Sequence, residues 1–126
     1  MLSLLEARLE LRKLARNWRF WSKRIAGAAK EVLGSCEAYV FGSVVKERVT
    51  GASDVDVLIV GDQLPGDCRG RGNLKAKIEE AAGLPLYHPF QIHLATRKEV
   101  EGNPIYRSAI HEGIALEGTR SEHDEH

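Results

Sequence analysis

The chain has 126 residues, of which 43% are hydrophobic and 29% charged, and its 18 Lys and Arg residues balance its 18 Asp and Glu residues. This length suits a single folded domain with a hydrophobic core, so global disorder is excluded. The zero net charge argues against a uniformly basic nucleic-acid-binding protein, because phosphate contacts require an excess of Lys and Arg. No apolar run reaches the roughly 18 to 20 residues that span a bilayer, and Glu6 and Arg8 interrupt any signal-peptide pattern. We therefore expect a cytoplasmic protein that does not associate with membranes.

The first third of the chain has the pattern of one long amphipathic helix. Apolar residues recur at alternating spacings of three and four from Leu4 to Val32, and Gly34 is a suitable C-terminal stop, which predicts a helix over residues 1–34. At about 1.5 Å per residue this helix would be roughly 45 Å long, more than so small a domain can cover. We therefore expect part of its apolar stripe to contact another chain, for example in a homodimer.

The charges of the two ends differ. Residues 1–35 hold eight basic residues against three acidic ones, whereas residues 99–126 hold seven acidic residues against two basic ones. The basic helix is either a solvated face or a surface for RNA, for a partner protein, or for the acidic end of a second copy.

After residue 34 the pattern changes to short strands alternating with helices. We predict strands over 38–41, 55–60, 90–94 and 114–117, a glycine-rich loop over 61–72, and a helix over 73–82. Two further helices are predicted by their N-terminal signals: Thr96 with Glu99 has the spacing of a capping box, and Asn103 precedes Pro104. These elements indicate an α+β domain over residues 35–118, with a sheet flanked by helices and the long helix as an extension. The polar tail over residues 119–126 is predicted to be disordered.

Two features point to phosphate and metal chemistry. Gly42 and Ser43 directly follow the first strand, where backbone N–H groups and a hydroxyl can approach a phosphate. Asp54 and Asp56 flank the start of the second strand and project from the same face, about 6 to 7 Å apart. Paired carboxylates repel each other unless a cation lies between them, and their hard oxygens suit Mg²⁺ or Mn²⁺. Each feature alone also occurs in ordinary turns and exposed strands, but their combination favours metal-assisted phosphoryl or nucleotidyl transfer.

At these residues the chain resembles the DNA polymerase beta-like nucleotidyltransferase superfamily, and within it the small minimal nucleotidyltransferases. The shared pattern is an apolar residue and Gly-Ser, then Ser-Asp-x-Asp and apolar residues, here Phe41-Gly42-Ser43 and Ser53-Asp54-Val55-Asp56. The resemblance implies a polymerase beta-like fold with a mixed sheet. It also implies that Gly42 and Ser43 hold a nucleoside triphosphate while Asp54 and Asp56 bind the divalent ions. We predict that Ser53, in the same motif, also contacts nucleotide.

The resemblance is incomplete at two places. Lys46 fits the basic residue that many relatives have after Gly-Ser, but Glu47 stands where they have Gly. Lys46 and Arg48 are either solvated loop charges or groups that neutralise phosphate. The family's third carboxylate is expected on the strand 90–94, where this chain has Gln91 and His93 on one side. His93 is a candidate metal ligand or general base, and Gln91 a weak neutral ligand.

Three functions therefore remain open. The first is transfer of a nucleoside monophosphate, AMP from ATP, to an acceptor. The resemblance implies a helical acceptor protein of the HEPN type, with this chain as the antitoxin of a toxin–antitoxin pair. The second is a binding module with the same fold that is catalytically impaired by the missing acid and acts through a partner or RNA. Modification of RNA ends is a third reading, tied to Arg12, Arg16 and Arg19 of the first helix.

Overall fold

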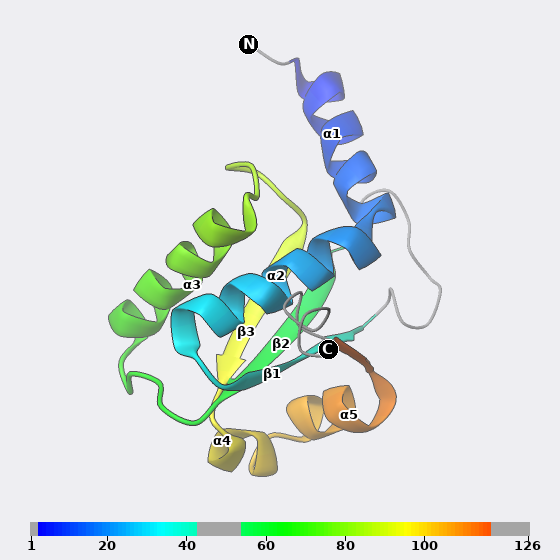
Figure 1. Cartoon of the computed structure of the whole chain (residues 1–126). Helices are drawn as coiled ribbons and strands as arrows, with labels where there is room; N and C mark the ends of the chain where they lie inside the picture. The colour runs from blue at the N-terminus through cyan, green and yellow to red at the C-terminus, as the bar shows by residue number, and fades with distance from the viewer. Residues whose placement is uncertain (1–2, 43–53, 117–126) are drawn as a thin grey trace, which may run out of the picture.

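The computed structural model describes residues 3–42 and 54–116, which form a four-stranded mixed sheet with helices on both faces (Figure 1). The strand order is β3-β2-β1-β4; β1 is antiparallel to β2 and β4, and β2 is parallel to β3. This arrangement confirms the expected α+β class with a mixed sheet. In chain order the elements are α1 (Leu4–Arg16), α2 (Trp18–Leu33), β1 (Cys36–Phe41), β2 (Val55–Gly61), α3 (Cys68–Ala82), β3 (Phe90–Ala95), α4 (Arg97–Glu101), α5 (Pro104–Glu112) and β4 (Ile114–Leu116).

The central strand β2 divides the core into two layers. Val55, Val57 and Ile59 are fully buried on the face covered by α2 and α3, together with Ile25 of α2 and Ile78 of α3. On the opposite face, Leu58 and Val60 pack with residues of α4 and α5. The alternation follows from the two-residue period of a strand, and the apolar run of β2 is explained by burial on both sides.

The prediction of one unbroken helix over residues 1–34 is wrong, because the chain bends at Asn17. This residue leaves the helical conformation (φ −94°, ψ 33°), and its side-chain amide donates to the carbonyl of Lys13 at 3.2 Å. An Asn side chain competes for backbone hydrogen bonds in this way and so disfavours a helix interior. The predicted end at Gly34 is confirmed as the C-cap of α2.

The bend separates a buried helix from an exposed one. Ile25 of α2 is completely buried, whereas Leu4 and Leu9 of α1 keep 72% and 45% of their surface exposed. In Figure 1, α1 extends away from the sheet that α2 covers. The apolar stripe is therefore part core and part free surface.

The other strands and helices lie close to their predicted positions, with one correction. Helix α3 begins at Cys68, so the predicted loop over 61–72 is shorter and the predicted helix over 73–82 longer. Asp67 caps this helix by accepting a hydrogen bond from the Gly70 N–H at 3.1 Å, which compensates for the poor helix propensity of the glycines that follow. Within the described residues no helix is long and apolar enough to cross a membrane. The predicted tail over 119–126 lies outside those residues.

The predicted N-terminal caps of helices α4 and α5 are both confirmed. Thr96 and Glu99 form a reciprocal capping box at α4, and the Asn103 side chain accepts hydrogen bonds from the first N–H groups of α5. Helix α5 then ends against the sheet at Gly113, where an added Cβ would meet the carbonyl oxygens of Ala109 and Val40, the latter at 2.5 Å. The close approach of two backbones therefore fixes the end of α5 on β1.

Replacing Gly113 by Ala should destabilise the fold. Both close neighbours of the new Cβ are backbone atoms, which cannot rotate away, so we expect a loss of about 1–3 kcal/mol in urea unfolding. Gly72→Ala is the matched control, because Gly72 lies in α3 with nothing within 4 Å of its Cβ position. There the better helix propensity of Ala should raise the free energy of unfolding slightly. Equal effects of the two substitutions would contradict the packing argument.

The ion pair between Arg71 of α3 and Glu99 of α4 should make stability depend on acid pH. Two hydrogen bonds of 2.8 and 2.9 Å join these side chains, and the Arg71 guanidinium, followed by the Thr96 backbone, lowers the pKa of Glu99. Because the pKa of Glu99 is lower in the folded than in the unfolded protein, the ion pair stabilises the fold at pH values above the ordinary pKa of a Glu side chain. This stability is lost as the pH falls through the lowered pKa. The difference in unfolding free energy between wild type and Arg71→Met should therefore narrow as the pH falls from 7 to 3. A part should remain, because Arg71 also donates to the carbonyls of Pro65 and Leu94. A difference between the two proteins that is constant with pH would refute the assignment.

Candidate nucleotide and metal site

The two predicted metal carboxylates lie at the start of β2. Asp54 directly precedes the strand and is exposed, whereas Asp56 is its second residue and is partly buried. Asp56 is opposite Phe41 of β1 and Gln91 of β3 in the sheet register. Its side chain therefore lies on the face that α4 and α5 cover, because directly paired residues share a face.

The turn after β1 brings backbone into direct contact with Asp56. Gly42 has φ +89°, a conformation that residues with a side chain rarely adopt, and its Cβ position lies 2.6 Å from Asp56 Oδ2. A side chain at position 42 would displace the carboxylate. Glycine is therefore required both by the conformation and by the close approach, which agrees with a position beside bound phosphate.

Four predicted nucleotide-binding residues, Ser43, Lys46, Arg48 and Ser53, lie outside the described residues. The same holds for the helix predicted to begin at Val44. Their roles stay predictions.

The structure brings Gln91 and His93 to the carboxylates. His93 Nε2 lies 3.1 Å from Asp56 Oδ1, and Gln91 Nε2 lies 3.5 Å from Asp54 Oδ2. All four predicted catalytic side chains therefore belong to one cluster on neighbouring strands. Gln91 of β3 is directly opposite Asp56, and His93 follows on the same face of that strand, so an amide and an imidazole stand where the resemblance expects a third acid.

Sequence reasoning missed the contribution of α5 to this cluster. The Tyr106 hydroxyl lies 3.4 Å from His93 Nδ1, and the His93 ring contacts the rings of Phe41 and Tyr106 at centroid distances of 5.3 and 5.8 Å. If Tyr106 donates to Nδ1, the neutral ring carries its proton on Nε2 and donates it to Asp56. No local pattern marks Tyr106, because the contact arises from the packing of α5 on the sheet.

The donor set fits a divalent ion completed by its substrate. In the described part of the chain, no group of three or more His, Cys, Asp or Glu side chains is placed to hold a metal. Mg²⁺ is commonly held by one or two carboxylates together with substrate phosphates and water. Asp54 and Asp56, with the Gly42 backbone beside them, match that requirement.

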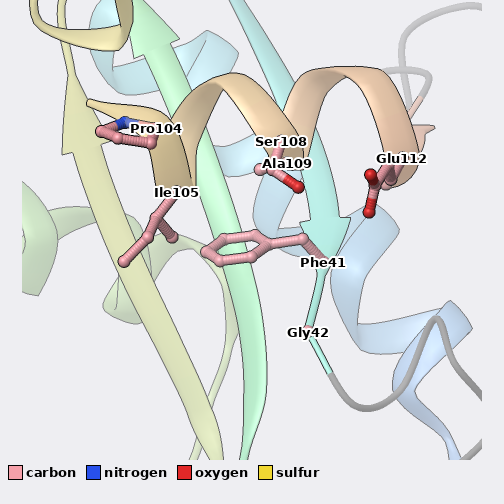
Figure 2. Close-up of a pocket in the computed structure, with 8 residues that line it drawn as sticks. Phe41, Gly42, Pro104, Ile105, Ser108, Ala109 and Glu112 are labelled. Atoms are coloured by element: carbon pink, nitrogen blue, oxygen red, sulfur yellow. The ribbon is translucent and has the colours of Figure 1, made fainter. Parts of the chain in front are cut away.

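A cavity of about 450 Å³ opens next to this cluster, between the end of β1 and helix α5 (Figure 2). It is mainly apolar, and Gly42 belongs to its wall. Its lining consists of Phe41, Gly42, Pro104, Ile105, Ser108, Ala109, Glu112 and Gly113.

Comparison with known proteins identifies the family of this domain. The family model of the nucleotidyltransferase domain matches residues 22–116. A crystal structure of a protein provisionally assigned as a nucleotidyltransferase is 27% identical, with a TM-score of 0.51, over 71% of this chain and 90% of that one. A second such protein, from Sulfolobus solfataricus, is 16% identical with a TM-score of 0.49, over 92% of this chain and 87% of that one. No curated protein sequence matches significantly.

The match to the family model extends over well over half of the chain and contains both the Gly42 turn and the carboxylates of β2. The expected nucleotidyltransferase fold is thereby confirmed, and the chain belongs to the nucleotidyltransferase domain family.

Proposed function

We propose that this protein transfers a nucleoside monophosphate, AMP from ATP, to an acceptor with the help of Mg²⁺ or Mn²⁺. The observation that carries the proposal is the contact between the Gly42 backbone and the Asp56 carboxylate. It places a turn suited to phosphate against a pair of carboxylates suited to a divalent ion, in a family defined by nucleotidyl transfer. A metal bound there would neutralise the charge of the phosphates.

The reaction breaks a phosphoanhydride bond of the triphosphate and forms a phosphoester bond to the acceptor. An acceptor hydroxyl gives its proton to a base and forms a bond to the α-phosphorus, the bond from this phosphorus to the bridging oxygen breaks, and pyrophosphate leaves with the electron pair. Asp54 and Asp56 would hold the ion, and the Gly42 turn would hold the phosphates close to it. His93 lies 3.1 Å from Asp56 and 3.4 Å from the Tyr106 hydroxyl, so it would position Asp56, and it is also our candidate for the base that accepts the hydroxyl proton.

The acceptor we propose is a helical protein of the HEPN type, modified in the cytoplasm, with this chain as the antitoxin. Support comes from α1, where Leu4, Leu5 and Leu9 are exposed on a helix that has few contacts with the rest of the fold. Exposed apolar side chains on one helix are typical of surfaces that pack against another helix. RNA as acceptor and a homodimer through α1 are the competing uses of this basic helix.

One observation favours a second function, a non-catalytic binding module. Strand β3 places Gln91 and His93, and no acid, beside Asp54 and Asp56, so the described site holds two carboxylates where the resemblance expects three. A module of this kind would bind its partner equally well with and without ATP and metal.

Removing either carboxylate should abolish transfer. We expect Asp54→Asn and Asp56→Asn to lower the transfer of label from α-labelled ATP to a purified HEPN-type protein at least about a hundredfold, because the metal loses a charged ligand. Calorimetry with Mn²⁺ and ATP should show weakened binding in the same variants. Asp62→Asn is the control, since Asp62 is exposed just after the last residue of β2 and pairs with Arg97 at 3.6 Å.

Transfer to an RNA oligonucleotide instead of the protein would correct the acceptor. A wild-type protein that captures its partner but binds neither ATP nor Mn²⁺ would support the binding module and overturn the enzymatic proposal.

Replacing Gly42 by Ala should impair both the fold and ligand binding. The left-handed backbone should reduce stability by about 1–2 kcal/mol, and the new Cβ should move the Asp56 carboxylate. Gly34→Ala is a matched control, because Gly34 has φ +83° but nothing within 4 Å. Both variants should lose stability in urea unfolding, whereas weaker binding of ATP with Mn²⁺ should be confined to Gly42→Ala. Unchanged binding in Gly42→Ala would argue against the phosphate role of this turn.

A further inference from the structure

The cavity between β1 and α5 has the properties of a small-molecule site. Its volume of about 450 Å³ falls in the usual range for ligand pockets, and its walls combine apolar groups with few polar ones. Ile105, on the wall formed by α5, keeps 64% of its surface exposed, so the cavity offers open apolar surface. In Figure 2 the Phe41 ring projects below α5 toward Ile105. A flat apolar group between them would cover this surface.

The polar groups of the cavity restrict what can occupy it. Ser108 offers a hydroxyl, and Glu112, at the last turn of α5, offers a carboxylate that only accepts hydrogen bonds when ionised. A phosphate group would be repelled by Glu112. An occupant that is flat, uncharged and carries an amino group would pack on Phe41 and donate to Glu112.

The cavity lies beside the carboxylate cluster, to which Phe41 and Gly42 connect it. Phe41 is the register partner of Asp56, so both side chains lie on the same face of the sheet, and Gly42 belongs both to the cavity wall and to the Asp56 contact. A nucleotide whose phosphates lie at the Gly42 turn therefore has this cavity directly beside it.

We propose that this cavity binds the nucleobase of the nucleoside triphosphate and that Glu112 selects bases with an exocyclic amino group. The proposal rests on the proposed function. Adenine donates from its amino group to a carboxylate, as cytosine does, whereas uracil has a carbonyl oxygen in place of the amino group, which Glu112 repels, and keeps only its ring N3–H as a donor. Stacking near Phe41 supplies affinity, and the carboxylate supplies the choice of base.

Filling the cavity tests the location of the base. Ser108→Trp places a large side chain into the cavity from an exposed position of α5, and His111→Trp places the same side chain on an exposed position of that helix outside the lining. We expect Ser108→Trp to weaken ATP binding at least about tenfold, the value of one lost stacking contact, and to leave tripolyphosphate binding unchanged. His111→Trp should bind both ligands like wild type. Titration calorimetry with Mn²⁺ measures the affinity of each ligand for wild type and for both variants.

Comparing ATP with tripolyphosphate separates the proposed base site from the proposed function. Wild-type ATP affinity in Ser108→Trp, including the case in which only transfer to the acceptor is lost, would overturn the base site and leave the proposed function intact. A wild-type protein that binds neither ATP nor tripolyphosphate would overturn both. Retained tripolyphosphate binding shows that Ser108→Trp is folded.

Glu112→Gln tests the selection of the base without filling the cavity. Wild type should bind ATP about tenfold more tightly than UTP, because one hydrogen bond to a charged group is replaced by repulsion. The amide of Gln both donates and accepts, so the ratio should fall to about twofold or less in the variant. Equal affinities of wild type for ATP and UTP, or a ratio that Glu112→Gln leaves unchanged, would overturn the role of Glu112.

Discussion

The contact between the Gly42 backbone and the Asp56 carboxylate is the constraint on which the site depends. It is created by the antiparallel pairing of β1 and β2, in which Phe41 faces Asp56 and the chain turns away at the next residue. A shift of this register by one residue would move Asp56 to the face occupied by α2 and α3. The register is protected against such a shift because Val55, Val57 and Ile59 are fully buried on that other face. The same apolar packing that stabilises the fold therefore positions the carboxylate.

Helix α5 connects this site to the rest of the fold. Its end is fixed on β1 by the backbone contact at Gly113, and from there it supplies Tyr106 to His93 and one wall of the cavity beside Gly42. His93 in turn contacts Asp56. A displacement of α5 would consequently reach Asp56 through Tyr106 and His93, and would change the cavity at the same time.

Much of this arrangement could be predicted from local sequence patterns. The strands, the capping box at Thr96, the Asn103 cap and the common face of Gln91 and His93 all follow from two-residue periodicity or from hydrogen bonds within a few residues. The bend at Asn17 was missed because the apolar stripe continues through it, and periodicity alone does not register one competing side-chain hydrogen bond. The early start of α3 was missed because the Asp67 cap lies among glycines.

The contacts of Tyr106 and the cavity could not be predicted for a different reason. Tyr106 is 13 residues from His93 in the sequence, and the contact exists because α5 packs across the sheet, with its end on β1 and Tyr106 at His93 of β3. The crossing depends on the close approach at Gly113, which is a property of two backbones in three dimensions. No pattern in either segment encodes it.

The presence of Gln91 and His93 in place of a third acid changes the electrostatics of the site in a definite direction. Three carboxylates on adjacent strands repel one another without a cation, whereas here the side chains of Gln91 and His93 lie within hydrogen-bonding distance of Asp54 and Asp56. The metal-free protein therefore avoids part of the repulsion that a three-acid site contains. A divalent ion must compete with these hydrogen bonds and gains one charged ligand fewer. Its affinity should then depend more strongly on the phosphates of the nucleotide, so that metal and nucleotide bind together rather than in sequence.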